Sequence, residues 1–134
     1  LPLKTQKIVN DAMEKTKNCH DFVFNICLNY GGKAEIIRAT KNFANDVLNN
    51  PKKIEELNET NFEDYLYTKG LPPVDLLIRT SGEMRTSNFL PWQLAYAEFI
   101  FTPIPWPDFD KEQFRNALNE YAKRSRRFGG LSHE

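Results

Sequence analysis

Apolar and polar residues follow one another along this chain in blocks whose lengths suit helices and strands. Residues 3–17 place apolar side chains at roughly helical spacing among lysines and acids, which predicts an amphipathic surface helix. Residues 33–48 show the same periodicity before an Asn-Asn-Pro stop, and residues 111–127 carry an apolar stripe on one face. A shorter helix is expected over residues 61–68, with Asn61 as its N-cap.

Short apolar runs between these helical patterns predict β-strands. Residues 22–28 read FVFNICL, an almost wholly apolar run that suits a strand covered on both faces. Residues 74–78 form a second run, broken only by Asp75, and residues 98–102 form a third. Because helical segments separate the strands, we expect an α/β fold with a mostly parallel sheet flanked by helices.

Composition and charge exclude several kinds of protein. The chain of 134 residues holds 18 basic and 18 acidic side chains, so no overall field favours nucleic acid or a membrane surface. Cys19 and Cys27 lack metal-type spacing and predict a reduced, cytosolic pair. No apolar run reaches the length of a membrane span. The first residue is Leu1 rather than methionine, which predicts that a further segment precedes it.

Polar side chains gather where the predicted central strand ends. They are Arg79, Thr80, Ser81, Glu83, Arg85, Thr86, Ser87 and Asn88. Guanidinium groups bind phosphate oxygens bidentately, and hydroxyls and backbone N–H groups complete such sites. Ligands of open α/β sheets lie beyond the carboxyl ends of the strands, where this cluster falls. The pattern predicts a site for an anion with several oxygens; the alternative is a surface loop whose charges pair with one another.

Two further polar features bear on the chemistry of the chain. Glu98 opens the apolar run at residues 98–102. A buried carboxylate needs a cation or a metal as its partner, whereas a glutamate at a strand end can also lie in solvent. The last predicted helix ends in a basic stretch at residues 123–127, followed by two glycines, which is typical of C-terminal capping.

A dense motif identifies a family resemblance. Residues 75–99 read DLLIRTSGEMRTSNFLPWQLAYAEF, and WPDF follows at residues 106–109. With NYGG at residues 29–32 and RRFGG at residues 126–130, the chain resembles the cis-prenyltransferases, in particular the bacterial undecaprenyl diphosphate synthases. The family's N-terminal DGNxRxA-type motif, which binds the allylic diphosphate and supplies a metal-binding aspartate, has no match. We therefore interpret residues 1–134 as the C-terminal portion of a single cis-prenyltransferase catalytic domain, with a partial form of that fold.

The resemblance implies a diphosphate site. Residues implied to bind isopentenyl diphosphate are Arg79, Arg85, Thr86 and Ser87, with Glu83 as a further candidate that orients the arginines. It also implies that Glu98 is a ligand of Mg²⁺, an ion that needs only one or two protein carboxylates besides water and phosphate. No catalytic residue is assigned within this portion of the domain.

The resemblance also implies a prenyl tunnel and a contact between subunits. Phe22 and Phe24, two residues apart on one face of the predicted strand, are candidates for lining the tunnel that holds the growing prenyl chain. Ordinary core packing is the alternative for each of them. Arg127, Gly129 and Gly130 are further candidates, implied to reach the diphosphate site of the neighbouring subunit in a homodimer.

The implied reaction is repeated Z-type condensation of isopentenyl diphosphate onto an allylic diphosphate, farnesyl diphosphate. Its product would be undecaprenyl diphosphate, the lipid carrier for cell-wall synthesis. We expect a cytoplasmic, Mg²⁺-dependent homodimer that contacts the membrane through its lipid product and binds no nucleic acid. Because the allylic half of the site has no match, we expect the isolated chain to be inactive. The alternative is a non-catalytic partner subunit of a two-component cis-prenyltransferase, although such subunits usually lose the arginine and glutamate set present here.

Overall fold

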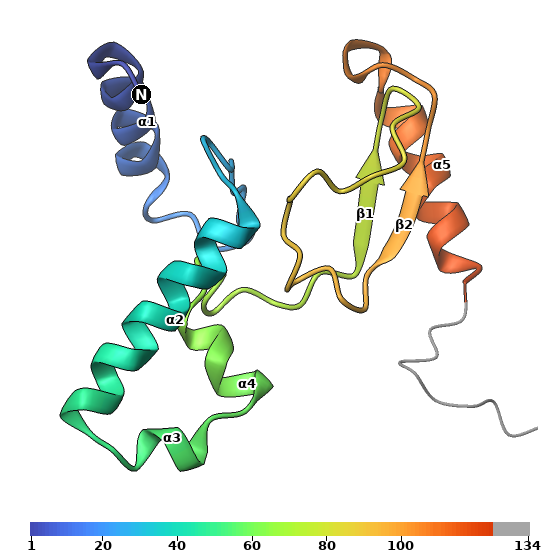
Figure 1. Ribbon diagram of the computed structural model, residues 1–134. Helices are drawn as coiled ribbons and strands as arrows, with labels where there is room; N and C mark the ends of the chain where they lie inside the picture. Colours follow the sequence, from blue (N-terminus) through green and yellow to red (C-terminus); the bar gives the residue numbers. More distant parts are fainter. Residues whose placement is uncertain (125–134) are drawn as a thin grey trace, which may run out of the picture.

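The computed structural model describes residues 1–124. Its elements, in chain order, are α1 (Leu3–Thr16), α2 (Gly32–Asn49), α3 (Lys53–Glu56), α4 (Glu59–Phe62), the 3₁₀ turn η1 (Glu63–Tyr65), β1 (Leu76–Arg79), β2 (Glu98–Phe101), the 3₁₀ turn η2 (Trp106–Asp108) and α5 (Lys111–Ala122). Figure 1 shows α1 to α4 gathered on one side of the molecule, and β1, β2 and α5 on the other. None of the helices within residues 1–124 has the length and apolar character needed to cross a membrane.

The two strands form a parallel pair, as the sequence predicts. Leu76 lies opposite Glu98, and Arg79 lies opposite Phe101. The residues between the strands form the connection that returns the chain to the start of β2, and α5 then packs against β2 (Figure 1). The carboxyl end of β1 is therefore the point at which the polar cluster of the sequence begins.

The core is divided between the two sides of the molecule. Within α2, Ala39 and Phe43 are buried. The Phe43 and Tyr65 rings pack edge to face with 5.5 Å between their centroids. Ile100 of β2 and Ala117 of α5 are buried where these two elements pack together. Ala39 and Phe43 lie four residues apart and so share one face of α2, whereas Ile37 and Leu48, apolar residues of the same helix, are exposed.

Residues 22–28 are not a strand, although their composition predicts one. No strand pairs with them anywhere in residues 1–124, and the side chains of Phe22 and Phe24 are 76% and 78% exposed. A β-strand is stable only when a neighbour satisfies its backbone N–H and C=O groups. The apolar residues favour an extended backbone, but a β-strand also needs a neighbouring strand, which the pattern of one segment cannot reveal.

The predicted helix over residues 61–68 is also wrong in its bounds. The chain forms α4 and then η1, and the N-cap is Asn58 rather than Asn61. Asn58 accepts a hydrogen bond from the Asn61 N–H, and the Asn61 side chain accepts one from the Asn58 N–H. This reciprocal capping box places the helix start three residues earlier than the sequence indicated.

Candidate functional site

The candidate site is the anion loop, which we define as residues 80–88. Its first turn is held by the backbone that follows β2: the Ser81 N–H donates to the Ile104 carbonyl at 2.9 Å, and the Gly82 N–H donates to the Thr102 carbonyl at 2.9 Å. Ser81 and Gly82 both have positive φ angles, which turn the chain sharply away from β1. The start of the anion loop is therefore fixed to the sheet.

The other end of the anion loop is fixed to α2 through Asn88. The Gly32 N–H donates to the Asn88 backbone carbonyl at 2.8 Å, and the Lys33 N–H donates to Asn88 Oδ1 at 2.9 Å. The first N–H groups of a helix have no partner within the helix, and the N-cap residue, Gly31, has no side chain to provide one. Asn88 therefore caps α2 from a distant part of the chain.

Gly32 explains the second glycine of the NYGG motif. A Cβ atom at this position would lie 2.0 Å from Pro91 Cδ and 2.5 Å from Pro91 Cγ. Only glycine allows the segment that follows the anion loop to come this close to the α2 backbone. The close approach of Pro91 therefore accounts for glycine at this position.

The two arginines of the site differ in their surroundings. Arg79 ends β1, and within residues 1–124 no carboxylate pairs with it. The Arg85 side chain is 64% exposed and forms an ion pair with Glu83. This pair matches the self-paired surface loop that we considered as the alternative, and it also matches the predicted contact of Glu83 with an arginine. Ser87 is exposed and Thr86 is half-buried, so the Ser87 hydroxyl is open to a ligand.

Glu98 lies apart from the anion loop. It pairs with Leu76 at the amino end of the sheet, whereas Arg79 lies at the carboxyl end. Side chains alternate along a strand and residues in register share a face, so Glu98 and Arg79 project from opposite faces. The structure thus does not bring the predicted metal ligand together with the predicted diphosphate ligand.

The Glu98 carboxylate is bound by a cation from α5. Arg124 donates to Glu98 Oε2 at 2.9 Å and to the Phe99 carbonyl at 2.8 Å, and it also pairs with Glu120 at 2.5 Å. The hydrogen bonds to Glu98 and then to Glu120 raise the pKa of Arg124. A buried carboxylate at Glu98 was predicted to need a cation or a metal as its partner. In this structure the partner is the guanidinium group of Arg124.

The donor set around Glu98 does not fit a Mg²⁺ site. Mg²⁺ requires oxygen ligands in octahedral geometry, and one Glu98 oxygen already accepts from a positively charged group. In the part of the chain that the structure describes, no group of three or more His, Cys, Asp or Glu side chains could hold a metal ion. Mg²⁺ therefore stays a prediction from the sequence.

The remaining predicted site residues lie either in the segment before α2 or outside the described residues. Phe22 and Phe24 are exposed in the irregular segment before α2, where they line no tunnel formed by residues 1–124. Arg127, Gly129 and Gly130 lie outside the described residues.

Sequence reasoning missed a buried carboxylate next to the site. Glu35, in the first turn of α2, is 1% exposed. It accepts hydrogen bonds from Tyr30 Oη at 2.5 Å, from the Tyr67 N–H at 2.6 Å and from Gln93 Nε2 at 3.2 Å. Burial, and then the bond to Glu35, raise the pKa of Tyr30. Glu35 lies four residues before Ala39 on the buried face of α2, and that spacing was the signal that could have revealed it.

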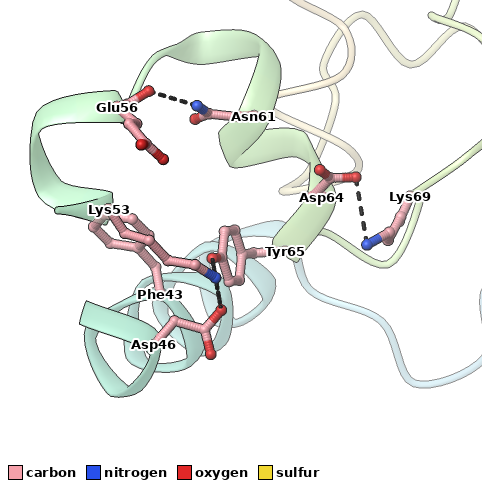
Figure 2. A pocket seen from close by; sticks show the side chains of 8 residues that line it. All are labelled: Phe43, Asp46, Lys53, Glu56, Asn61, Asp64, Tyr65 and Lys69. Atoms are coloured by element: carbon pink, nitrogen blue, oxygen red, sulfur yellow. Dashed lines mark hydrogen bonds and ion pairs between the residues drawn. The ribbon is translucent and has the colours of Figure 1, made fainter. Parts of the chain in front are cut away.

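A hollow lies between α2, α3, α4 and η1, and none of its lining residues belongs to the anion loop. Figure 2 shows its lining residues, which are Phe43, Asp46, Lys53, Glu56, Asn61, Asp64, Tyr65 and Lys69. Lys53 Nζ lies 2.6 Å from Asp46, Tyr65 Oη donates to the same carboxylate at 2.9 Å, and Lys69 lies 3.4 Å from Asp64 (Figure 2). Both lysines of this hollow are paired with acids, which leaves the anion loop as the better candidate for an anionic ligand.

The parallel strand pair, the helix α5 that packs against it and the polar loop that follows β1 define an α/β protein. The family model described as "Putative undecaprenyl diphosphate synthase" matches residues 1–129, and the chain belongs to this family. The resemblance to the cis-prenyltransferases is thereby confirmed.

Individual relatives agree with this assignment. The chain is 50% identical over 130 residues to an isoprenyl transferase of Clostridium perfringens, covering 97% of this chain and 51% of the relative. It is 46% identical over 127 residues to a ditrans,polycis-undecaprenyl-diphosphate synthase of Legionella pneumophila, described as specific for (2E,6E)-farnesyl diphosphate, covering 95% of this chain and 53% of the relative. The chain thus spans about half the length of the curated relatives that it matches.

A solved structure confirms the fold class. Lavandulyl diphosphate synthase from Lavandula x intermedia, solved in complex with dimethylallyl diphosphate, superposes with a TM-score of 0.90 at 36% identity. The match covers 96% of this chain and 56% of the solved chain. The α/β fold with a parallel sheet flanked by helices, predicted from the sequence, is therefore that of the cis-prenyltransferases.

Proposed function

We propose that this chain provides the isopentenyl diphosphate half of a prenyltransferase active site. The observation that supports the proposal is the anion loop, which directly follows Arg79, carries Arg85 and Ser87, and is fixed at both ends. Guanidinium groups and hydroxyls held on a fixed backbone bind a diphosphate with little loss of conformational freedom. Family membership makes prenyl transfer the reaction that such a site would serve.

Arg85 must change partners when the diphosphate binds. In this structure Arg85 is paired with Glu83, and both side chains are exposed to solvent. Exposed ion pairs contribute little to stability, so a doubly charged diphosphate can replace the Glu83 carboxylate at low cost. Glu83 then holds Arg85 near its binding position in the absence of substrate.

The remaining parts of the proposal rest on the family resemblance and on the name of one relative. The Legionella pneumophila relative is described as specific for (2E,6E)-farnesyl diphosphate, and we propose farnesyl diphosphate as the allylic substrate and undecaprenyl diphosphate, a cell-wall lipid carrier, as the product. We further propose a cytoplasmic homodimer in which Arg127, Gly129 and Gly130 reach the neighbouring subunit, and a membrane contact through the lipid product. Mg²⁺ is proposed as a cofactor from the family resemblance; Glu98 could serve as its ligand only after the ion pair with Arg124 opens, and no step is derived through the ion.

Catalysis in this half of the site would come from positioning. The homoallylic diphosphate must be held so that its double bond lies near the allylic carbon, which replaces a bimolecular encounter by an oriented one. Arg79 and Arg85 bind the diphosphate that is retained in the product, so their contribution falls on the binding of isopentenyl diphosphate. The allylic diphosphate that leaves must be stabilised by residues other than the anion loop.

Binding measurements on the chain test the proposal. We expect isopentenyl diphosphate and inorganic diphosphate to bind, and Arg85→Ala to weaken both by tenfold or more, because a charge-assisted hydrogen bond contributes about 1.5–3 kcal/mol. Arg115→Ala, at an exposed position on α5, is the matched control and should bind like the unmodified chain. Equal affinity of the Arg85 and Arg115 variants would show that the anion loop is not the diphosphate site.

A turnover assay tests the inactivity of the isolated chain. Labelled isopentenyl diphosphate and farnesyl diphosphate, supplied together with Mg²⁺, should yield no labelled polyprenyl product with the 134-residue chain alone. Incorporation of label would contradict the assignment of the chain to one half of the site. Binding of isopentenyl diphosphate without turnover, lost in the Arg85 variant, supports the half-site, whereas a non-catalytic partner subunit predicts no binding at the anion loop.

A further inference from the structure

We propose that Asn88 is a positioning residue for diphosphate binding, and that it sets the position of Ser87 by tying the anion loop to the first turn of α2. The inference rests on the proposed function and adds a residue to which we have assigned no contact with substrate. It concerns a relationship between two segments that lie far apart in the sequence and are joined by direct hydrogen bonds.

The tie consists of two hydrogen bonds to consecutive N–H groups of α2. Gly32 donates to the Asn88 carbonyl at 2.8 Å, and Lys33 donates to Asn88 Oδ1 at 2.9 Å. Both donors are fixed in direction because they belong to a regular helix of 18 residues. Asn88 therefore accepts hydrogen bonds from two donors whose directions are fixed by the helix. Because Ser87 is the adjacent residue, its position is fixed as well.

The backbone around Asn88 would not hold its shape without such support. The φ angles of Ser87, Asn88 and Leu90 are 48°, 65° and 47°. Left-handed backbone costs a residue other than glycine about 1–2 kcal/mol, and asparagine tolerates it better than serine or leucine. The hydrogen bonds to α2 offset this cost, so their loss should let residues 87–90 relax and move the Ser87 hydroxyl.

Two further contacts hold residues 91–93 to α2. Neither involves Ser87, so the position of Ser87 depends on its neighbour Asn88. The Pro91 ring lies against the Gly32 backbone, at the place that a Cβ atom would occupy. Gln93 donates to the buried carboxylate of Glu35 at 3.2 Å. These contacts fix residues 91–93, so the loss of the Asn88 side chain should change the loop locally rather than release the whole segment.

Variants of Asn88 test the loop side of the tie. Asn88→Gly removes Oδ1 but suits a positive φ, whereas Asn88→Ala removes Oδ1 and adds backbone strain. We expect affinity for isopentenyl diphosphate to fall about tenfold in the glycine variant and further in the alanine variant. The control Asn116→Ala, exposed on α5, should bind like the unmodified chain.

Variants of Lys33 test the helix side of the tie without altering the loop. Lys33→Pro removes the N–H that donates to Asn88 Oδ1 and puts the ring Cδ in its place, in the first turn of α2, where this N–H has no partner within the helix. Lys33→Ala keeps this N–H and removes only the exposed ammonium group. We expect the proline variant to weaken isopentenyl diphosphate binding as Asn88→Gly does, and the alanine variant to weaken it less.

A double-mutant cycle separates positioning from general destabilisation. If the hydrogen bond is the cause, the combined Asn88→Gly and Lys33→Pro variant should bind no more weakly than the worse single variant, because each removes the same interaction. Fully additive losses, or full affinity in Asn88→Gly, would overturn the positioning role while leaving the proposed function in place. Absence of isopentenyl diphosphate binding by the unmodified chain would overturn both.

Discussion

Arg124, just beyond the last turn of α5, donates a hydrogen bond of 2.9 Å to the carboxylate of Glu98, the first residue of β2. The same guanidinium group donates to the Phe99 carbonyl at 2.8 Å, so the end of α5 is fixed to the edge of the sheet at two points. The residue predicted to bind a metal ion is therefore also the residue that anchors α5. Any cation at Glu98 has to compete with an arginine from the same chain.

This anchor leads to a prediction about stability. Arg124→Gln should lower the free energy of unfolding by about 1 kcal/mol, because the pair is partly exposed and partly screened by solvent. Urea unfolding followed by circular dichroism measures the change, with Arg115→Gln on the same helix as the control. Equal stability of the two variants would mean that the contact with Glu98 does not hold α5 in place.

The close approach of Pro91 to α2 leads to a second prediction. Gly32→Ala should destabilise the chain by about 2 kcal/mol or more, because the added Cβ would lie 2.0 Å from Pro91 Cδ and the segment must shift. Thermal unfolding measures the effect. Lys33→Ala, which changes the neighbouring exposed side chain without a clash, is the control, and an unfolding midpoint of Gly32→Ala equal to that of the control would contradict the prediction.

The contact of Tyr30 with Glu35 predicts a dependence of stability on pH. Burial, and then this hydrogen bond, raise the pKa of Tyr30 above its ordinary value near 10. A group whose pKa is higher in the folded state stabilises that state below its unfolded-state pKa, and this contribution is lost as the pH rises further. The free energy of unfolding should therefore fall between about pH 9 and about pH 12. Tyr30→Phe should show a smaller decrease, and identical pH profiles would contradict the contact.

Phe24 and Phe43 give a prediction about packing. Phe24 is 78% exposed and Phe43 is 8% exposed. Phe24→Ala should change the free energy of unfolding of the chain by less than about 0.5 kcal/mol, whereas Phe43→Ala should lower it by about 3 kcal/mol or more. Chemical denaturation of both variants tests this difference. A large loss of stability in Phe24→Ala would show that residues 22–28 are packed in the chain.

The sequence was sufficient for most of the elements that depend on neighbouring residues, although it placed the N-cap of α4 three residues too late. The periodicity of residues 33–48 predicted α2, and the apolar runs at residues 74–78 and 98–102 predicted the two parallel strands within two residues of their observed bounds. The motif over residues 75–99 was sufficient to identify the family, because it can be recognised from the types and order of its residues without the folded structure. In each case the information lies within one short segment.

Contacts between distant segments were decided only by the tertiary structure. Asn88 caps a helix 55 residues away, Gln93 reaches Glu35 across 58 residues, and Arg124 reaches Glu98 across 26. A periodic pattern assigns a residue to a face or to a strand, but not to a partner, because the partner depends on how the chain returns. Residues 22–28 illustrate the same limit: their side chains favour a strand, and a strand forms only where another supplies its hydrogen bonds. The sequence by itself thus determined the local elements and the family, while the folded chain decided which of the predicted site residues lie together.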